Sequence, residues 1–219
     1  MNLPDPARSL SALNAIVDAD AAGARGWSLP DLARAYLAGG VRFLQIRAKT
    51  EPSGRLLDAC DAVVAEARGC GAVVIINDRA DLARLARADG VHVGQTDLPP
   101  AAVRTLLGPA AIVGLSTHTA AQIDAALAEP ISYVAVGPVF GTGTKETGYP
   151  PVGLDLVRYA ASGGRAGRRL PVVAIGGITL DRATAVLAAG ATAVAVIGDL
   201  LAGGDPEARA REYVRRLAG

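Results

Sequence analysis

The sequence has little net charge, few cysteines and no long hydrophobic run, and each of these features excludes a class of protein. The 22 Lys and Arg residues nearly balance 21 Asp and Glu, so a net charge of +1 gives no sign of a nucleic-acid partner or a charged membrane partner. Although 51% of the residues are hydrophobic, no apolar run approaches the roughly 20 residues that a membrane span needs. Residues 1–5 lack the basic-then-apolar pattern of a signal peptide.

Only two cysteines are present, Cys60 and Cys70, and both fall in one expected helix. Ten residues of helix separate them by roughly 15 Å, which is too far for a disulfide bond. We expect two free thiols in a reducing compartment and no metal role for either. Together with the absence of membrane and export signals, this predicts a cytoplasmic protein.

Short apolar strands alternate with alanine-rich helical segments along the whole chain. The expected strands are 13–17, 41–46, 72–76, 90–93, 111–115, 131–136, 171–175 and 191–197. The expected helices are 29–38, 52–68, 80–88, 100–107, 120–128, 153–162, 180–189 and 206–217. Continuous apolar strands are typical of a parallel sheet that is covered on both faces. The alternation predicts an α/β fold, a (β/α)₈ TIM barrel, better than an open doubly wound sheet. We expect one domain over residues 1–219, with the barrel core at about 13–217.

Two aspartates, Asp78 and Asp97, follow the third and fourth expected strands. Consecutive parallel strands point the same way, so both carboxylates are expected on one rim of the barrel. Hard divalent ions such as Mg²⁺ take oxygen ligands, often one or two carboxylates completed by substrate phosphate and water. The alternative is that both aspartates are helix N-caps.

Three polar residues, Gln45, Arg47 and Lys49, alternate at the end of the second expected strand. In an extended segment their side chains share one face. If they point inward, two cations and an amide meet at one place, which favours binding of phosphate oxygens. The alternative is that the arginine pairs with nearby aspartates, and both can hold when no substrate is bound.

Glycines end the seventh and eighth expected strands, at Gly176-Gly177 and Ile197-Gly198. Bare backbone N–H groups after these two strands commonly bind phosphate in such barrels, although glycines also make tight turns. The glycine-rich segment 137–153 carries Lys145 close to Thr142 and Thr144. It is predicted to be a lid that closes on an anionic ligand, with a solvated loop as the alternative.

The two histidines do not indicate a metal site or a catalytic triad. His92 lies within an expected strand, and no second metal-ligating residue stands at the sequence spacing of a metal site. We therefore expect His92 to face inward and to form hydrogen bonds. His118 lies near Ser116 but has no acidic residue nearby in sequence to orient it. Trp27 and the five tyrosines are interpreted as packing or loop residues.

Two anion sites beside a metal site indicate a reaction that joins two phosphorylated small molecules. One anion would be a leaving pyrophosphate, and the other a phosphate that positions its substrate. No general acid–base pair stands out. Positioning and charge stabilisation are then expected to carry most of the catalysis.

The chain resembles the thiamine phosphate synthase family over about residues 13–217. The motifs that carry the resemblance are QIRAK (45–49), INDRADLA (76–83), DGVHVGQTDLP (89–99), GLSTHT (114–119), YVAVGPVFGTGTK (133–145), VVAIGGIT (172–179) and GATAVAVI (190–197). The resemblance implies a TIM barrel that couples 4-amino-2-methyl-5-pyrimidinylmethyl diphosphate to a thiazole phosphate. It also implies a dissociative path, in which Mg²⁺ and cations withdraw pyrophosphate and the thiazole nitrogen captures a pyrimidinylmethyl cation.

The resemblance further implies a role for each matching residue. Asp78 and Asp97 would hold Mg²⁺, and Arg47, Lys49, Ser116 and Lys145 would be catalytic. The substrate-binding residues would be Gln45, Arg47, Lys49, Asn77, Ser116, Thr142, Thr144, Lys145, Gly177, Ile197 and Gly198. The family commonly has serine at position 198, so a hydroxyl contact is lost here.

Two alternatives to this activity stay open. A thiazole tautomerase keeps the barrel and the phosphate site but lacks the metal and diphosphate site, and a non-catalytic phosphate-binding barrel would not need the aspartate pair. The expected partners are small-molecule substrates. The sequence does not fix the oligomeric state, and a homo-oligomer is possible.

Overall fold

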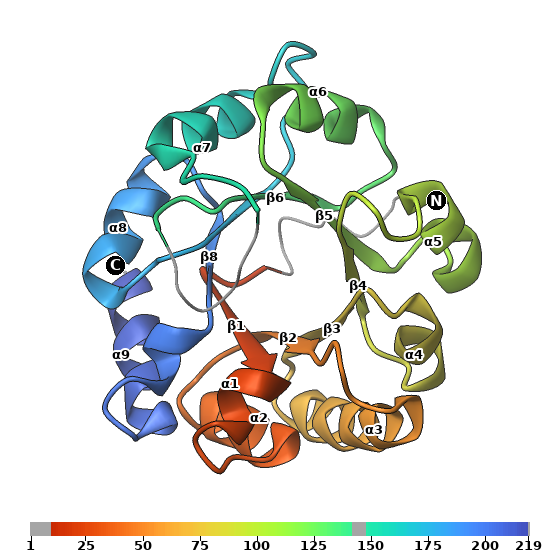
Figure 1. Cartoon of the computed structure of the whole chain (residues 1–219), viewed down its shortest axis with the longest axis vertical. Helices are drawn as coiled ribbons and strands as arrows, with labels where there is room; N and C mark the ends of the chain where they lie inside the picture. The colour runs from red at the N-terminus through yellow and green to blue at the C-terminus, as the bar shows by residue number, and fades with distance from the viewer. Residues whose placement is uncertain (1–9, 142–147, 219) are drawn as a thin grey trace.

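Eight parallel strands form a closed barrel in the order β1 to β8 in the computed structural model, which describes residues 10–141 and 148–218 (Figure 1). The strands are β1 (Leu13–Asp18), β2 (Phe43–Arg47), β3 (Val73–Asn77), β4 (Gly90–Val93), β5 (Ile112–Thr117), β6 (Tyr133–Val136), β7 (Val172–Ile175) and β8 (Ala193–Val196). Strand β1 pairs with both β2 and β8, which closes the ring. The predicted TIM barrel is confirmed.

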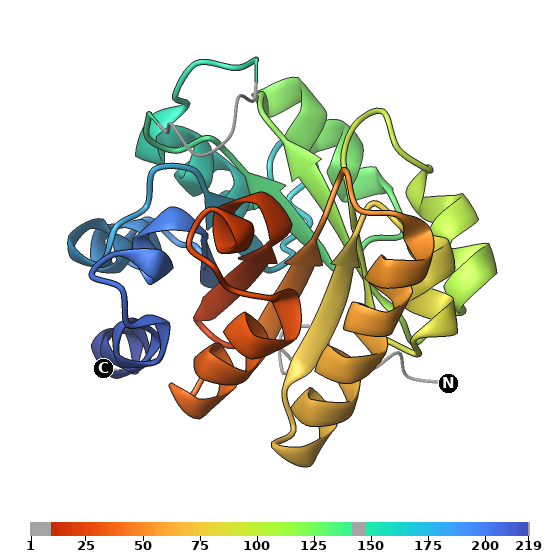
Figure 2. The ribbon, with the colours of Figure 1, turned by 60° about the horizontal axis from the view of Figure 1, so that its bottom comes forward.

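Helices surround the barrel on its outside (Figure 1). They are α1 (Ala19–Gly23), α2 (Leu29–Ala38), α3 (Ser53–Gly69), α4 (Ala80–Leu85), α5 (Pro100–Leu107), α6 (Ala120–Ala128), α7 (Gly153–Ser162), α8 (Leu180–Ala188) and α9 (Pro206–Leu217), with the 3₁₀ helix η2 (Gly198–Leu201) after β8. Helix α9 packs against both α2 and α8. Figure 2 shows the helices on the outer face of the strands. None of the helices in the described parts of the chain is long and apolar enough to cross a membrane.

Helix boundaries follow local capping chemistry. The Ser28 side chain accepts a hydrogen bond from the Asp31 backbone at the start of α2, and Asp205 accepts from Ala208 at the start of α9. Helix α7 ends at Ser162, and its C-cap residue is Gly163, whose φ of +93° suits glycine.

Most predicted elements are found with small shifts at their ends, but two short elements were not expected. Helix α1 has five residues and η2 has four, which is too short for a hydrophobic period to show in sequence. The placement of both cysteines in one helix was wrong, because α3 ends at Gly69 and Cys70 is its C-cap. Both thiols are free, with Cys60 buried and Cys70 exposed.

Apolar side chains fill two layers, one between the strands and the helices and one inside the barrel. Inside, the rings of Phe43 and Tyr133 meet edge to face at 6.2 Å. Small residues, among them Ala135 and Ala195, also face this interior. A cavity therefore extends from the barrel mouth down to Tyr133.

Candidate active site

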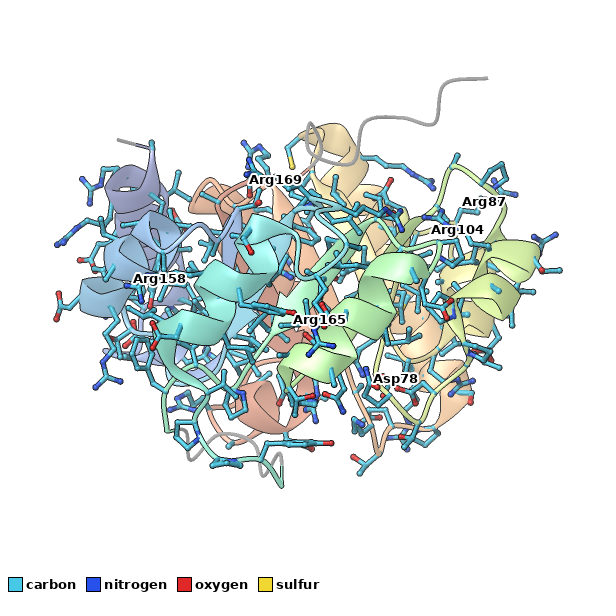
Figure 3. The ribbon with its side chains drawn as sticks, turned by 90° about the horizontal axis from the view of Figure 1, so that it is seen from above. Asp78, Arg87, Arg104, Arg158, Arg165 and Arg169 are labelled. Atoms are coloured by element: carbon cyan, nitrogen blue, oxygen red, sulfur yellow. The ribbon has the colours of Figure 1, made fainter. Side chains whose placement is uncertain are left out.

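A cavity of about 600 Å³ occupies the end of the barrel where the strands terminate. Its lining includes every predicted site residue that the structure describes: Gln45, Arg47, Lys49, Asn77, Asp78, Asp97, Ser116, Gly177, Ile197 and Gly198. The other three, Thr142, Thr144 and Lys145, lie outside the described residues. Figure 3 shows Asp78 at one end of the barrel, with Arg87 and Arg169 toward the other. The structure thus brings the described candidates together, and their roles stay predictions.

The two aspartates follow neighbouring strands, as predicted. The Asp78 backbone N–H donates to the His92 carbonyl at 2.7 Å, which joins the end of β3 to β4. Asp78 has a φ of +63°, a conformation that few non-glycine residues adopt and one that aspartate tolerates better than most. Asp97 Oδ2 accepts from the Gly94 N–H at 2.7 Å.

Neither aspartate caps a helix. The N-cap residues of α4 and α5 are Arg79 and Pro99, and neither makes a side-chain cap hydrogen bond. The alternative interpretation of Asp78 and Asp97 as helix N-caps is therefore wrong. Both carboxylates instead face the cavity.

The environment of Asp78 disfavours its charged form. Burial, followed by the hydrogen bond and charge of Asp97, raises the pKa of Asp78, and Lys49 acts in the opposite direction. Lys49 Nζ lies 3.2 Å from Asp78 Oδ2. Two adjacent carboxylates provide a hard, oxygen-only donor set that fits Mg²⁺. Within residues 10–141 and 148–218 there is no group of three or more His, Cys, Asp or Glu that could hold a metal. A cation here would complete its shell with substrate oxygens or water.

The Arg47 guanidinium is held by a carboxylate that the sequence did not single out. Its Nη1 forms an ion pair with Asp18 Oδ2, and only 12% and 5% of the two side chains are exposed. The other oxygen, Asp18 Oδ1, accepts from the Ala21 N–H at 2.9 Å and caps α1. Asp18 thus both starts a helix and orients the arginine. The alternative that Arg47 pairs with nearby aspartates is confirmed for one aspartate, Asp18 at the end of β1, which was not among the predicted site residues.

The Asp18→Ala variant should lose about 3 kcal/mol of stability, because it leaves a buried arginine unpaired and removes the cap of α1. Urea denaturation would measure the loss. Asp31→Ala is the comparison variant, since the exposed Asp31 side chain pairs with Arg34 and accepts from the Ser28 hydroxyl, and exposed contacts of this kind should contribute far less. Equal losses in the two variants would contradict the structural importance of the Asp18–Arg47 pair.

His92 joins the barrel interior to the candidate site. Its Nδ1 lies 2.8 Å from the Tyr133 hydroxyl, and its Nε2 lies 2.8 Å from Ser116 Oγ. The imidazole also stacks on the Tyr133 ring, with 5.6 Å between centroids. Gly114 leaves the space for this arrangement, because a Cβ there would lie 2.1 Å from Tyr133 Cζ. The prediction that His92 faces inward and forms hydrogen bonds is confirmed.

We expect Tyr133→Phe to lower the free energy of unfolding by about 1–2 kcal/mol, because it removes the hydroxyl partner of His92 Nδ1. Chemical denaturation would show this loss. Tyr36→Phe is the control, because the buried Tyr36 hydroxyl has no hydrogen-bond partner among the described residues and its removal should cost nothing. A Tyr133→Phe protein as stable as the wild type would show that the hydrogen bond contributes little.

Sequence reasoning missed several groups that line the cavity. The His118 imidazole stacks on the Tyr149 ring at 4.0 Å, and its Nδ1 lies 2.6 Å from the Gly137 carbonyl. Tyr133 and Tyr149, interpreted as packing or loop residues, both face the cavity. Asn14 is buried, and neither polar atom of its amide has a hydrogen-bond partner in the part of the chain that the structure describes. The motifs quoted above contain His118 and Tyr133 but imply no site role for either, while Asn14 and Tyr149 lie outside every motif and reach the site only through the fold.

The glycines after β7 have a packing role that the structure makes plain. Gly176 and Gly177 have φ values of +102° and +62°. The Gly176 carbonyl accepts from the Phe140 N–H at 3.0 Å, so the segment after β6 lies against this turn. A Cβ at Gly177 would lie 2.4 Å from the Gly141 carbonyl oxygen. The alternative that these glycines make a tight turn is confirmed, and phosphate binding by the same turn stays a prediction.

The turn after β7 is joined to the segment after β8. Asp199 Oδ2 accepts from the Leu180 N–H at 3.1 Å, from Arg209 Nη2 at 2.8 Å and from the Tyr213 hydroxyl at 2.6 Å. Asp199 therefore links the start of α8, helix η2 and α9. This fixes the relative positions of Gly177 and Gly198 on one side of the cavity, across the barrel from β3.

Comparison with known proteins gives a consistent result. A family model described as thiamine monophosphate synthase matches residues 13–200. The thiamine-phosphate synthase of Anaeromyxobacter dehalogenans is 48% identical over 178 residues, which cover 81% of this chain and 78% of that protein. The thiamine-phosphate synthase of Roseiflexus castenholzii is 43% identical over 196 residues, covering 90% and 83%.

A solved structure agrees with these relatives. The thiamine phosphate pyrophosphorylase from Pyrococcus furiosus superimposes with a TM-score of 0.83 at 27% identity, covering 97% of this chain and 99% of that one. The family model spans most of the chain, and the similarity to the relatives extends over most of their own length. The chain therefore belongs to the thiamine monophosphate synthase family, as its sequence motifs predicted.

Proposed function

We propose that this chain is a thiamine phosphate synthase that joins 4-amino-2-methyl-5-pyrimidinylmethyl diphosphate to a thiazole phosphate. The main structural support is the division of one cavity into two chemically different sides. Arginine, lysine and two carboxylates come from β2 to β4, and a glycine-lined turn comes from β7 and β8. One side suits a metal-bound diphosphate, and the other suits a phosphate monoester.

On the first side, Arg47 and Lys49 would bind the diphosphate oxygens. Both cations lie in ion pairs when no substrate is bound, with Asp18 and Asp78 respectively. Lys49 is half exposed, so it can turn from Asp78 toward an incoming anion. Gln45 and Asn77 would donate amide hydrogen bonds to the same substrate. Hydrogen bonds to the charged diphosphate are charge-assisted, and they are stronger than hydrogen bonds between two neutral groups.

Asp78 and Asp97 would hold Mg²⁺, because their oxygen donors suit a hard cation and their mutual repulsion is relieved by one. When bound, the ion would neutralise negative charge on the diphosphate. The raised pKa of Asp78 and its unusual backbone conformation support this role. A bound cation would offset the burial and repulsion that raise this pKa.

In the reaction, the bond between the pyrimidinylmethyl carbon and the diphosphate oxygen breaks, and a bond from that carbon to the thiazole nitrogen forms. Arg47 and Lys49 would stabilise the charge on the departing pyrophosphate. Ser116, held at 2.8 Å from His92 Nε2, would contact the pyrimidine substrate or the pyrophosphate. Lys145, with Thr142 and Thr144, is proposed to contact the substrates from the segment outside the described residues.

On the other side, Gly177, Ile197 and Gly198 would bind the phosphate of the thiazole substrate through backbone N–H groups. The Asp199 hydrogen bond to Leu180 holds the two backbone segments together. This pre-organisation lets the second substrate be positioned without much loss of protein conformational entropy.

The test is pyrophosphate release by the purified protein given both substrates, with Mg²⁺ and then with excess EDTA. We expect release that needs both substrates and the metal, with thiamine phosphate formed in equal amount. Activity that survives EDTA would overturn the metal assignment. No release under any condition would overturn the synthase proposal and leave the tautomerase and the non-catalytic barrel as candidates.

We also propose that the protein works in the cytoplasm, because its two thiols are free and no cysteine pair is cross-linked. Its proposed partners are the two small-molecule substrates. A homo-oligomer stays a prediction, which light scattering on the purified protein would test.

A further inference from the structure

One cation at the cavity has no place in the assignments above. Arg182 lies in the first turn of α8, directly after the glycine turn that follows β7, and it lines the cavity. Its Nη1 donates to the Gly177 carbonyl at 3.0 Å. The guanidinium also stacks over the Phe140 ring, with 4.8 Å to the centroid. Arg182 thus contacts both backbone segments that border the glycine side of the site.

Arg182 differs from the other cations of the cavity in its pairing. Arg47 is paired with Asp18, and Lys49 is paired with Asp78. Arg182 has no ion pair with any carboxylate of the described residues. Within the described residues, the charge of Arg182 is therefore not neutralised by a paired carboxylate.

The position of Arg182 is unfavourable for helix stability. The first turn of a helix carries the positive end of its dipole, where acidic side chains stabilise and basic ones do not. Arginine is instead favoured in the last turn. The helix dipole therefore does not favour a basic residue at this place, beside the glycine turn.

Arg182 also orients the backbone of the glycine turn. In a planar trans peptide the carbonyl and the N–H of the next residue point in opposite directions. The Gly176 carbonyl is directed to the Phe140 N–H and the Gly177 carbonyl to Arg182. The N–H groups of Gly177 and Ile178 are thereby turned away from these two partners, and both residues line the cavity.

We infer that Arg182 binds the phosphate of the thiazole substrate and selects the phosphorylated form over the free alcohol. Arginine has five N–H donors in a planar fork, and the Gly177 carbonyl uses one of them. The remaining donors suit a phosphate monoester dianion, whose charge the backbone N–H groups alone neutralise only in part. This inference rests on the proposed function and assigns it a further substrate-binding residue.

The test compares Arg182→Gln with the wild type on two second substrates, thiazole phosphate and the unphosphorylated thiazole alcohol. We expect the KM for thiazole phosphate to rise about tenfold or more, since a charged hydrogen-bond partner is lost. The KM for the alcohol and for the pyrimidine diphosphate should stay within about twofold. Calorimetric titration with thiazole phosphate should show the same loss of affinity. Arg182→Lys should recover part of the loss, because it keeps the charge but not the fork.

The matched control is Arg158→Gln, which removes an exposed arginine on α7 that pairs with Asp155. Figure 3 shows Arg158 on the outer face of the helices, and this variant should behave as wild type. An unchanged KM for thiazole phosphate in an active Arg182→Gln enzyme would overturn this inference and leave the proposed function intact. An equal rise in KM for the thiazole alcohol and for thiazole phosphate would also overturn it, because that result would indicate a purely structural role for Arg182. A wild-type protein without turnover would instead overturn the proposed function on which the inference rests.

Discussion

The Asp78→Asn variant should lose at least about 100-fold in Mg²⁺-dependent turnover while its fold stays intact. Asparagine keeps the size of the side chain but removes one of the two carboxylates proposed to hold the cation. The rate of pyrophosphate release at several Mg²⁺ concentrations would measure the loss. Asp81→Asn is the control, because Asp81 belongs to the same segment but forms an exposed ion pair with Arg79. Full activity in Asp78→Asn would contradict the metal assignment.

The same variant should make the metal-free protein more stable near neutral pH. The pKa of Asp78 is raised in the folded state, so folding disfavours its ionised form. This cost is absent below the unfolded pKa of about 3.9 and develops as the pH rises through the higher folded pKa. Asparagine does not titrate, so the Tm advantage of the variant should grow as the pH rises from about 3.9 toward neutrality. Scanning calorimetry in EDTA would measure it.

Asp81→Asn should show the opposite sign in this experiment. The hydrogen bond from Arg79 lowers the pKa of Asp81, so its carboxylate stabilises the fold once it is ionised. That contribution is lost as the pH falls through the lowered folded pKa. The exposed position of the pair makes the effect small.

Destabilisation of metal-free Asp78→Asn at pH 7 would contradict the prediction of a more stable variant. It would show that the lost pairing with Lys49 outweighs the relief of repulsion from Asp97.

Gly177→Val should raise the KM for thiazole phosphate about 100-fold, equivalent to about 2.7 kcal/mol of binding free energy. A Cβ at this position would lie 2.4 Å from the Gly141 oxygen and 2.8 Å from Phe140 Cβ, so the turn has to move. The φ of +62° adds strain for a β-branched residue. The KM for the pyrimidine diphosphate should change less than about threefold. Steady-state kinetics with each substrate varied in turn would measure the two KM values separately.

The control for Gly177→Val is Gly26→Val, which separates backbone strain from crowding. Gly26 has a similar φ of +74°, but among the described residues nothing lies within 4 Å of the place that a Cβ would occupy there. This variant should lose stability from strain alone and keep both KM values. Equal weakening of both substrates in Gly177→Val would mean that the two anion sites are assigned to the wrong sides of the cavity.

The fold was predictable because the sequence repeats one simple pattern. Strands such as Gly90–Val93 are short apolar runs, and helices such as Leu29–Ala38 are amphipathic and bounded by caps. A parallel sheet buried on both faces leaves little freedom in how such units are arranged. The family prediction is confirmed by the match to residues 13–200. Short elements such as helix α1 were missed, because five residues show no period.

The candidate site was predictable only where it follows the strands in sequence. Asp78, Asp97 and Arg47 stand shortly after or at the end of a strand, so the barrel topology places them at one mouth. The carboxylate that holds Arg47, and the hydroxyl that holds His92, are 29 and 41 residues away in the chain. Such partners depend on how side chains pack across the barrel, and a single sequence carries no signal of that packing.

The ion pairs at the mouth also determine how a substrate arrives. Because Arg47 and Lys49 each lie beside a carboxylate, most of their charge is cancelled before the field reaches bulk water. The whole chain carries a net charge of only +1, which adds no general attraction for anions. We therefore expect these paired cations to add little long-range steering of a diphosphate, so that its association rate depends little on ionic strength. Under the proposed function, capture would depend on short-range exchange of ionic partners once the substrate has reached the cavity.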